Sequence, residues 1–373
     1  MSSSQFVRVK ARSMAPIRPG GRLAPFFRIQ LRAMAIIAAI AFILFYAPWN
    51  VARAAESVHP AFRSFVASLW PQARRMGVSR PIFEAAFAGL TPDPVILAKT
   101  RKQAEFVKPI WQYLAAAVSK KRIGTGREKF AATKPVLARI ARTYGVDPYI
   151  VLGVWGLETN FGSNTGDTSV IRDLATLAYA RYRGGYFRRE LLIALKILQE
   201  GHVSVAAMRG SWAGAMGQTQ FMPSAFMRYA VDFQGNGRKD IWTSAPDALA
   251  STANFLAKHG WVRGWTWGYE VLPPASAFLA PGRTLPFATW AREGFRRADG
   301  FAMPTEGNAS LLLPAGSNGP AFLVTKNFYV IKTYNNSTAY ALGVALLSDR
   351  IAGAAPLKGT WPGQDFPTAS IAR

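Results

Sequence analysis

Apolar residues recur at three- and four-residue intervals along most of the chain, the spacing that places them on one face of a helix. Four stretches carry this pattern: HPAFRSFVASLWPQARRMG, VILAKTRKQAEFVKPIWQYLAAAVSKK, KFAATKPVLARIARTYG and YFRRELLIALKILQEG. The chain has 373 residues and 50% of them are hydrophobic, which is enough to bury a substantial core. The pattern therefore predicts a mainly α globular protein.

The pattern changes between about Val271 and Val330. This part is rich in Pro and Gly and contains the short β-like runs SLLLPAG and PAFLVTKNFYVI, before a last helix begins near Ser337. We expect a small β-containing insertion near 271–330 within one helical domain that covers 56–355. Residues 356–373 then form a C-terminal tail.

The first part of the chain has a different composition. Basic residues precede an apolar run at 33–47, and no acidic residue occurs before Glu56. The run is shorter than the ~20 residues that span a bilayer, Pro48 ends it, and VARAAE offers the small residues of a cleavage site. We expect a signal peptide over 1–54 and hence a periplasmic protein; the alternative is an uncleaved N-terminal membrane anchor.

Positive charge dominates the sequence. Lys and Arg number 45 against 20 acidic residues, a net charge of +25, and removal of 1–54 leaves +17. An exported protein with this charge is expected to meet an acidic cell-wall polymer or phospholipid headgroups rather than nucleic acid. The alternative is a basic surface that serves solubility.

The rare residue types restrict the chemistry. The chain has no cysteine, which excludes disulfides, thiolate catalysis and cysteine-bound zinc. It has only three histidines, and no pair of them has the spacing of metal ligands. Acid–base chemistry must therefore depend mainly on carboxylates.

One carboxylate interrupts an apolar helix in the stretch YGVDPYIVLGVWGLETNFGSN. Asp147 is expected to cap this helix, Pro148 to occupy its first position and Gly162 to end it. Glu158 then lies in the last turn.

The surroundings of Glu158 should raise its pKa. Val154 and Trp155 precede it by four and three residues on the same helix face, so burial among apolar groups is expected. The negative end of the helix dipole acts in the same direction. A protonated Glu near neutral pH suits the protonation of a glycosidic oxygen. The alternative is a surface glutamate or one half of an internal ion pair.

Several motifs, in the same order, resemble those of one enzyme family. They are GLETNFG, SVIRDLATLAYARYRGGYFRREL, RGSWAGAMGQTQFMPSAFMRYAVDFQGNGRKDIW, PDALASTANFLAKHGW and KTYNNSTAYALGVALLSDRIAG. Together they closely resemble the lytic murein transglycosylases of the membrane-bound B type, from about residue 60 to 355. The resemblance implies a lysozyme-like helical core in which Glu158 cleaves the bond between N-acetylmuramic acid and N-acetylglucosamine, forming 1,6-anhydromuramoyl ends. Peptidoglycan is the implied partner, together with proteins that build or remodel the wall.

Two other functions stay open at this point. A hydrolytic muramidase would normally use a second carboxylate, and the nearest candidates, Asp167 and Asp173, are interpreted as structural. A non-catalytic peptidoglycan-binding scaffold would fit the charge but not the setting of Glu158.

The motif GSWAGAMGQTQFMPSAF combines small residues, which let a chain approach closely, with the amides of Gln218 and Gln220. Amides suit neutral sugars. The resemblance implies that Ser211 and Gln220 line the cleft near Glu158, with Gln220 at the N-acetyl group of the muramoyl sugar. The alternative is tight helix packing with solvated amides.

Aromatic residues with a polar tip commonly contact sugars, because the ring stacks on the pyranose and the hydroxyl forms hydrogen bonds. The resemblance places Tyr113, Tyr334, Asn335 and Tyr340 at substrate-contacting positions, with Asn335 as the partner that orients the catalytic glutamate. Phe255 stands where relatives can carry a tyrosine, and is expected to keep the stacking surface without the hydroxyl.

The segment DFQGNGRKDIWTSAPD is similar to a calcium-binding loop, a site that some members of the family use. The candidate ligands are Asp232, Gln234, Asn236, the carbonyl of Arg238 and Asp247. Two of these side chains are neutral amides, and Arg238 adds positive charge. We therefore expect an ordered loop without a tightly held metal, and no cofactor.

Overall fold

The structure is a computed structural model in which residues 60–101, 109–275 and 280–362 are described. The chain divides into two units, 1–60 and 61–373, and the description below concerns the second. The predicted signal peptide at 1–54 lies outside the described residues. Within the described ranges, no helix is both long and apolar enough to cross a membrane.

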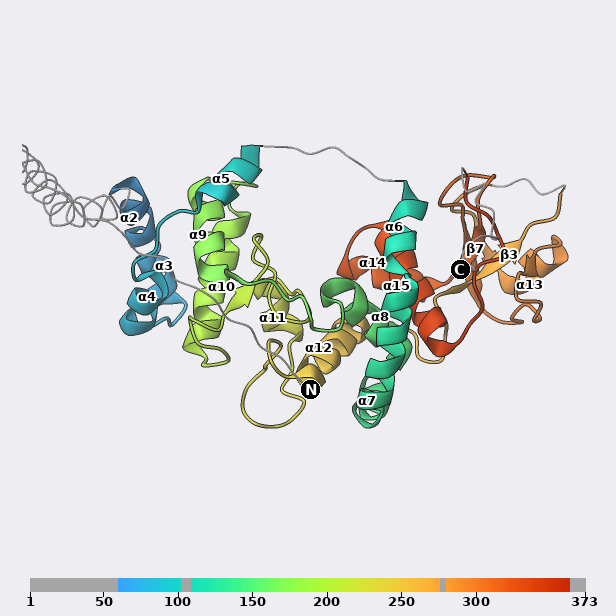
Figure 1. Ribbon diagram of the computed structural model, residues 1–373, viewed down its shortest axis with the longest axis horizontal. Coiled ribbons are helices and arrows are strands. Elements are labelled where there is room, and N and C mark those ends of the chain that lie inside the picture. The colour runs from blue at the N-terminus through green and yellow to red at the C-terminus, as the bar shows by residue number, and fades with distance from the viewer. Residues whose placement is uncertain (1–59, 102–108, 276–279, 363–373) are drawn as a thin grey trace, which may run out of the picture. The chain divides into compact units, whose positions relative to one another are not determined.

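Six helices of the N-terminal half pack together (Figure 1). They are α2 (Pro60–Ala67), α3 (Trp70–Arg75), α4 (Arg80–Phe87), α5 (Pro94–Arg101), α9 (Val170–Tyr179) and α10 (Tyr186–Gln199). The first periodic stretch of the sequence forms two helices rather than one. Pro71 lies in the first turn of α3, where a proline favours the start of a new helix over the continuation of the previous one.

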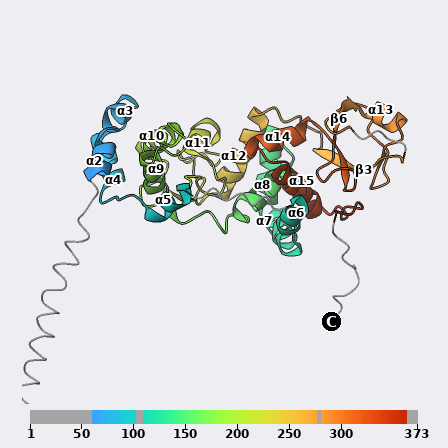
Figure 2. The same ribbon diagram turned by 90° about the horizontal axis from the view of Figure 1, so that it is seen from above.

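Helix α8 (Pro148–Thr159) is central to the rest of the helical body. It packs against α7 (Lys120–Tyr144), α12 (Ala245–Lys258) and α15 (Thr338–Ala352), as Figures 1 and 2 show. A Cβ atom on Gly153 would lie 2.2 Å from the Ser348 Oγ atom and 2.8 Å from the Val344 carbonyl oxygen. Gly153 therefore permits the close approach of α8 and α15.

Three shorter helices complete this body: α6 (Ile110–Ala117), α11 (Pro223–Tyr229) and α14 (Lys326–Tyr334). Helices α6 and α14 both pack against α15, while α11 joins α10 to α12. The predicted last helix is confirmed, since Ser337 caps α15 by accepting a hydrogen bond from the Tyr340 amide at 3.3 Å.

The predicted β-containing insertion is also confirmed. Five antiparallel strands form a sheet in the order β4-β6-β7-β3-β5. They are β3 (Gly268–Leu272), β4 (Thr284–Pro286), β5 (Arg296–Arg297), β6 (Asn308–Leu312) and β7 (Ala321–Val324). With α13 (Phe287–Arg292) the sheet encloses a small core of its own, which contains Trp290 and Phe295.

One part of the insertion differs from the prediction. The β-like run PAFLVTKNFYVI is a strand only as far as Val324, and its second half is the start of α14. Thr325 caps this helix by accepting a hydrogen bond from the Asn327 amide at 3.2 Å. The Asn327 side chain donates to the carbonyls of Val262 and Trp265 at 3.0 and 2.8 Å. These distant partners anchor the helix start and override the local β preference.

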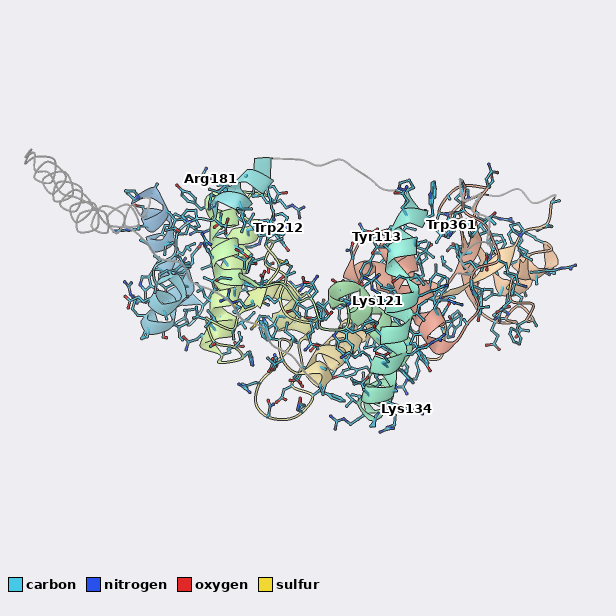
Figure 3. The ribbon with its side chains drawn as sticks, viewed as in Figure 1. Tyr113, Lys121, Lys134, Arg181, Trp212 and Trp361 are labelled. Atoms are coloured by element: carbon cyan, nitrogen blue, oxygen red, sulfur yellow. The ribbon has the colours of Figure 1, made fainter. Side chains whose placement is uncertain are left out.

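Basic side chains are exposed on several elements. Lys121 and Lys134 lie on α7, and Arg181 follows α9 (Figure 3). The positive charge is thus carried on the surface of the described domain, where it is available to an anionic partner.

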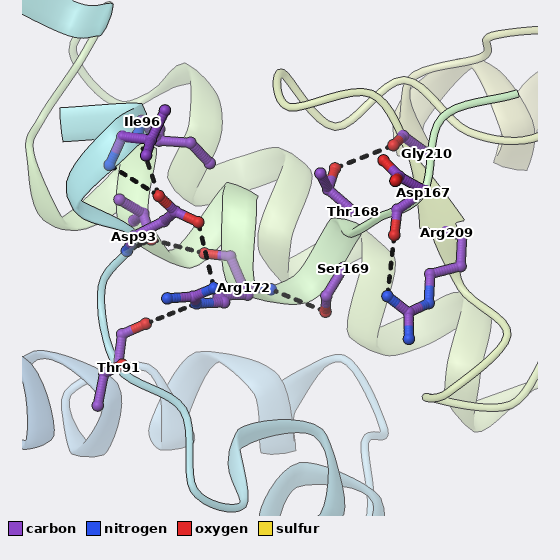
Figure 4. A network of polar contacts seen from close by, with 11 residues as sticks. Thr91, Asp93, Ile96, Asp167, Thr168, Ser169, Arg172, Arg209 and Gly210 are labelled. Carbon is purple, nitrogen blue, oxygen red and sulfur yellow. Dashed lines mark hydrogen bonds and ion pairs between the residues drawn. The ribbon is translucent and has the colours of Figure 1, made fainter. Parts of the chain in front are cut away.

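A network of polar contacts joins the loop before α5 to α9 (Figure 4). The Arg172 guanidinium forms an ion pair with Asp93 at 3.1 Å and donates to the Thr91 carbonyl at 3.0 Å. Close by, β1 (Thr168–Ser169) and β2 (Arg209–Gly210) form a short antiparallel pair. The network fixes the N-terminal helices against the segment that follows α8.

Candidate active site

Helix α8 starts where the sequence predicts. Asp147 accepts a hydrogen bond from the Tyr149 amide at 2.8 Å, and Pro148 is the first helical residue. The helix ends at Thr159, so the prediction of Gly162 as the stop is wrong by three residues. Asn160 and Phe161 adopt positive φ angles of 49° and 60°.

The early end of α8 has a packing cause. The Phe161 amide donates to the Trp155 carbonyl at 3.1 Å, and the two rings meet edge to face at 5.8 Å. Phe161 thus folds back under the helix and is buried beside Gly156. Glu158 is left in the last turn, as predicted.

Glu158 is half-buried and has one strong hydrogen bond within the described residues. The Tyr340 hydroxyl donates to the Glu158 Oε1 atom at 2.6 Å. Burial raises the pKa of Glu158 to about 7, and the hydrogen bond from Tyr340 opposes this rise by stabilising the charged form. The predicted increase in pKa is therefore found, and burial is its main cause.

Three tyrosines surround Glu158. Burial raises the pKa of Tyr113, Tyr334 and Tyr340, and the nearby Glu158 charge adds to the rise. The rings of Tyr334 and Tyr340 lie nearly parallel with centroids 6.5 Å apart, and Tyr334 donates to the Thr219 carbonyl at 2.7 Å. Helices α6, α14 and α15 thus each supply one hydroxyl to the end of α8.

Gln218 fastens the loop after β2 to α8. The Trp155 Nε1 group donates to the Gln218 side-chain oxygen at 3.0 Å, and the Gln218 side-chain nitrogen donates to the Trp242 carbonyl at 3.1 Å. The Thr159 hydroxyl donates to the Gln218 main-chain carbonyl at 3.1 Å. Gln218 is buried and fully engaged, so it holds the loop in place. The sequence analysis predicted an amide suited to neutral sugars at Gln218, but it did not predict that this side chain anchors the loop to α8.

Gln220 follows Thr219, whose carbonyl accepts the hydrogen bond from Tyr334. It has a positive φ of 51°, and its side-chain nitrogen donates to the carbonyls of Thr165 and Gly217 at 3.0 and 2.9 Å. Ser211 is half-buried, and its hydroxyl accepts a hydrogen bond from the Ala215 amide at 3.2 Å. Both side chains have fixed positions, and their contact with substrate stays a prediction.

Two predicted site residues take other places. Phe255 is 8% exposed and stacks on His259 at 4.0 Å, behind Tyr334, so the structure does not offer its ring as a sugar-stacking surface. Asn335 is exposed at the end of α14. The hydrogen bond that orients Glu158 comes from Tyr340 instead, because α15 directs that hydroxyl at the carboxyl group.

The two alternative carboxylates lie in different surroundings, and their structural role stays a prediction. Asp167 is exposed, and its main-chain carbonyl accepts a hydrogen bond from Arg209 at 2.9 Å (Figure 4). Asp173 is 1% exposed within α9, where burial raises its pKa to about 6, and its Oδ2 atom has no hydrogen-bond partner among the described residues. Neither hydrogen-bonds to Glu158 in the described structure.

The calcium-like loop is held by hydrogen bonds to its own backbone. Asp232 accepts from the amides of Gly235, Asn236 and Gly237 at 2.7 to 3.1 Å. Asp247 is fully buried and accepts from three further main-chain amides. These hydrogen bonds confirm an ordered loop, and the absence of a tightly held calcium ion stays a prediction. Within the described ranges, no group of three or more His, Asp or Glu side chains is arranged to hold a metal.

The same span of chain matches a known family. The profile of the family described as the transglycosylase SLT domain matches residues 61–349, which include Glu158 and its three tyrosines. The chain belongs to the transglycosylase SLT domain family. Membership of this family of lytic enzymes confirms the resemblance drawn from the motifs.

Individual members of the transglycosylase family are similar to this chain. Membrane-bound lytic murein transglycosylase B of Escherichia coli is 37% identical over 223 residues, which are 58% of this chain and 60% of that protein. This chain thus matches less than two thirds of the length of that relative.

Solved structures cover more of the chain. SltB3 from Pseudomonas aeruginosa, in complex with NAG-anhNAM-pentapeptide, is 45% identical and covers 82% of this chain and 83% of its own, with a TM-score of 0.78. Escherichia coli Slt35, in complex with calcium, is 29% identical and covers 79% of this chain and 93% of its own, with a TM-score of 0.66. These matches confirm the mainly helical, lysozyme-like fold with a small β-sheet.

Proposed function

We propose that this protein is a lytic transglycosylase that cleaves the β-1,4 bond between N-acetylmuramic acid and N-acetylglucosamine in peptidoglycan, leaving 1,6-anhydromuramoyl ends. The observation that carries the proposal is the state of Glu158. A pKa of about 7 keeps a large fraction of this carboxyl protonated at neutral pH, as a general acid requires. Its place in a family of transglycosylases supports the same reaction.

Glu158 acts twice in this reaction. It first donates its proton to the leaving glycosidic oxygen as positive charge develops on the muramoyl ring. The carboxylate so formed is stabilised by the Tyr340 hydroxyl at 2.6 Å. It then accepts the proton of the muramoyl O6 hydroxyl as O6 attacks the anomeric carbon, which closes the anhydro ring and regenerates the acid.

Ring closure replaces hydrolysis because O6 is already attached to the reacting sugar. Intramolecular attack with good alignment reaches effective molarities on the order of 10⁵ M or more, far above the concentration of bulk water. A hydrolase would normally need a second carboxylate to activate water. The solved complex of SltB3 contains an anhydro sugar, which supports ring closure.

The surrounding residues position the glycan. Tyr113 and Tyr334 lie near enough to the acid for its charge to raise their pKa, and they contact sugar rings and hydroxyl groups of the bound strand. Ser211 and Gln220 contact the strand from the loop after β2, with Gln220 at the N-acetyl group. Asn335, exposed at the end of α14, contacts the strand at its edge.

The cellular setting follows from the same proposal. We place the protein in the periplasm, exported through 1–54, where its remaining net charge of +17 favours contact with anionic wall polymers and membrane surfaces. Cell-wall synthesis or remodelling proteins are the protein partners that this role implies.

Mass spectrometry of muropeptides tests the reaction. Purified sacculi are digested with the wild type and with Glu158→Gln, whose amide has nearly the same shape but cannot donate the proton. The wild type should release anhydro-muropeptides, one water lighter than muramidase products and resistant to borohydride, and the variant should release none. Reducible ends that carry oxygen from labelled water would make the enzyme a hydrolase. Binding of sacculi without any cleavage would make it a scaffold.

A further inference from the structure

A second cavity lies away from Glu158. Its volume is about 600 Å³, within the range of roughly 300–1,000 Å³ that is usual for small-molecule sites. It is enclosed by α6, the C-terminal half of α15, strands β3 and β5, and the chain segment 354–361. Glu158 is not among the residues that line it.

Helix α6 separates this cavity from the active site. Trp111, Leu114 and Val118 line the cavity, and their spacing of three, four and seven residues defines one face of the helix. Tyr113 lies on another face, beside Gly343 of α15 and Glu158. The two sites therefore share one helix as a common wall.

Helix α15 connects the same two sites along its length. Tyr340 contacts Glu158 near the N-terminal end, and Asp349 lines the cavity near the C-terminal end. Nine residues of α-helix separate them, which corresponds to about 14 Å at the usual helical rise. The cavity is thus close enough to the cleft to serve the same polymeric substrate.

Aromatic faces and a neutral carboxyl characterise the cavity. Trp111 and Trp361 are both half-buried and line it from α6 and from the C-terminal segment; Figure 3 labels Trp361. The buried Trp267 donates its Nε1 hydrogen to the Asp349 Oδ2 atom at 3.1 Å. Burial raises the pKa of Asp349 to about 7, so this carboxyl can both donate and accept hydrogen bonds near neutral pH.

Charges on the sheet side of the cavity already have partners. Arg297 forms an ion pair with Asp299 and stacks on the Tyr269 ring at 4.1 Å. Glu270 accepts hydrogen bonds from the amides of Lys358 and Gly359 at 3.0 and 2.6 Å, which fixes the segment that closes the cavity. Lys120, Arg350 and Lys358 also line the cavity, and none of them forms an ion pair within the described residues.

We propose that this cavity is a second glycan-binding site, which takes an N-acetylated saccharide. The apolar faces of a pyranose ring stack on Trp111 and Trp361, and the hydroxyl and acetamido groups bond to Asp349 and the Thr266 hydroxyl at the cavity wall. The inference rests on the proposed action on peptidoglycan. The cavity holds a neighbouring part of the substrate, on the opposite side of α6 from Glu158.

Calorimetric titration with tri-N-acetylchitotriose tests the proposal. The titrated protein is Glu158→Gln, so turnover plays no part in the measurement. We expect two sites per chain, and we expect Trp361→Ala to weaken one of them at least tenfold. Trp361 lies in the C-terminal segment, outside the helices and strands, so removal of its side chain is compatible with folding. Circular dichroism of the variant checks that the fold is retained. Trp111→Ala probes the opposite wall and should weaken the same site.

The matched control is Trp265→Ala, which removes an exposed tryptophan that does not line the cavity and should leave both sites intact. A single site that neither cavity variant alters would overturn the proposal. If Trp361→Ala abolishes binding of a free stem peptide and leaves saccharide binding unchanged, the cavity is a peptide site and the glycan proposal is overturned. Failure of the proposed reaction appears separately, as the absence of anhydro products from the wild type.

Discussion

The raised pKa of Glu158 has a measurable effect on protein stability. A carboxyl that ionises near 4.5 in the unfolded chain and near 7 in the folded protein keeps its proton longer in the native state. It contributes its full stabilisation below about pH 4.5, and this contribution is lost as the pH rises to about 7. The loss amounts to about 3 kcal/mol, since each pH unit in this window corresponds to about 1.4 kcal/mol.

Glu158→Gln removes the titrating group and keeps its shape. Other carboxyls with a raised pKa, such as Asp349, titrate in both proteins and cancel in the difference. The free energy of unfolding of the wild type, minus that of the variant, should therefore fall by about 3 kcal/mol between about pH 4 and about pH 8. Urea denaturation followed by tryptophan fluorescence measures this difference at each pH.

Ala132→Gln is the control, because it changes an exposed residue of α7 without adding or removing a titrating group. Its difference from the wild type should stay flat over the same range. If the Glu158→Gln difference is equally flat, to within about 1 kcal/mol, the carboxyl is not held protonated by burial. Its role as a general acid would then have no basis in the folded structure.

Three further predictions concern the surroundings of the acid. Tyr340→Phe removes a hydrogen bond that lowers the pKa of Glu158, so the alkaline limb of the pH–activity profile should move to higher pH. The reaction rate should also fall roughly tenfold, because the carboxylate loses its hydrogen-bond donor. An unchanged pH–activity profile would contradict this prediction. Gly153→Ala should lower the free energy of unfolding, measured by urea denaturation, by about 1–3 kcal/mol, because the added Cβ would meet the Ser348 Oγ atom at 2.2 Å. Gly124→Ala is its control, because Gly124 faces open space on α7, and this substitution should raise the free energy of unfolding by about 0.5–1 kcal/mol. Calcium or a chelator should shift the melting temperature little, and a rise of many degrees with calcium would show that the loop at 232–247 binds it.

The sequence alone located the acid and the start of its helix. Asp147 and Pro148 are local signals, since a capping side chain and a first-turn proline act within one helical turn. The apolar neighbours of Glu158 on its own helix were also enough to predict the direction of its pKa change. The end of the helix was not predictable, because it depends on Phe161 folding back onto Trp155.

The chemical partners of Glu158 depended on the tertiary structure. The motif led us to predict Asn335 as the partner of Glu158 and Tyr340 as a substrate contact. The packing of α15 against α8 instead brings the Tyr340 hydroxyl to 2.6 Å from the carboxyl. In the same way, Gln218 and Gln220 look alike in sequence, but the buried Gln218 accepts a hydrogen bond from Trp155, whereas Gln220 donates to the Thr165 carbonyl.

Local signals thus determined the helical character, the β-containing insertion and the position of the acid, because capping, periodicity and turn chemistry act over a few residues. These signals could not predict the cavity beside α6, since its walls come from segments up to 250 residues apart, as Trp111 and Trp361 illustrate. Which side chains share a site is decided by the approach of distant elements, such as α15 across Gly153, and no local pattern encodes that approach.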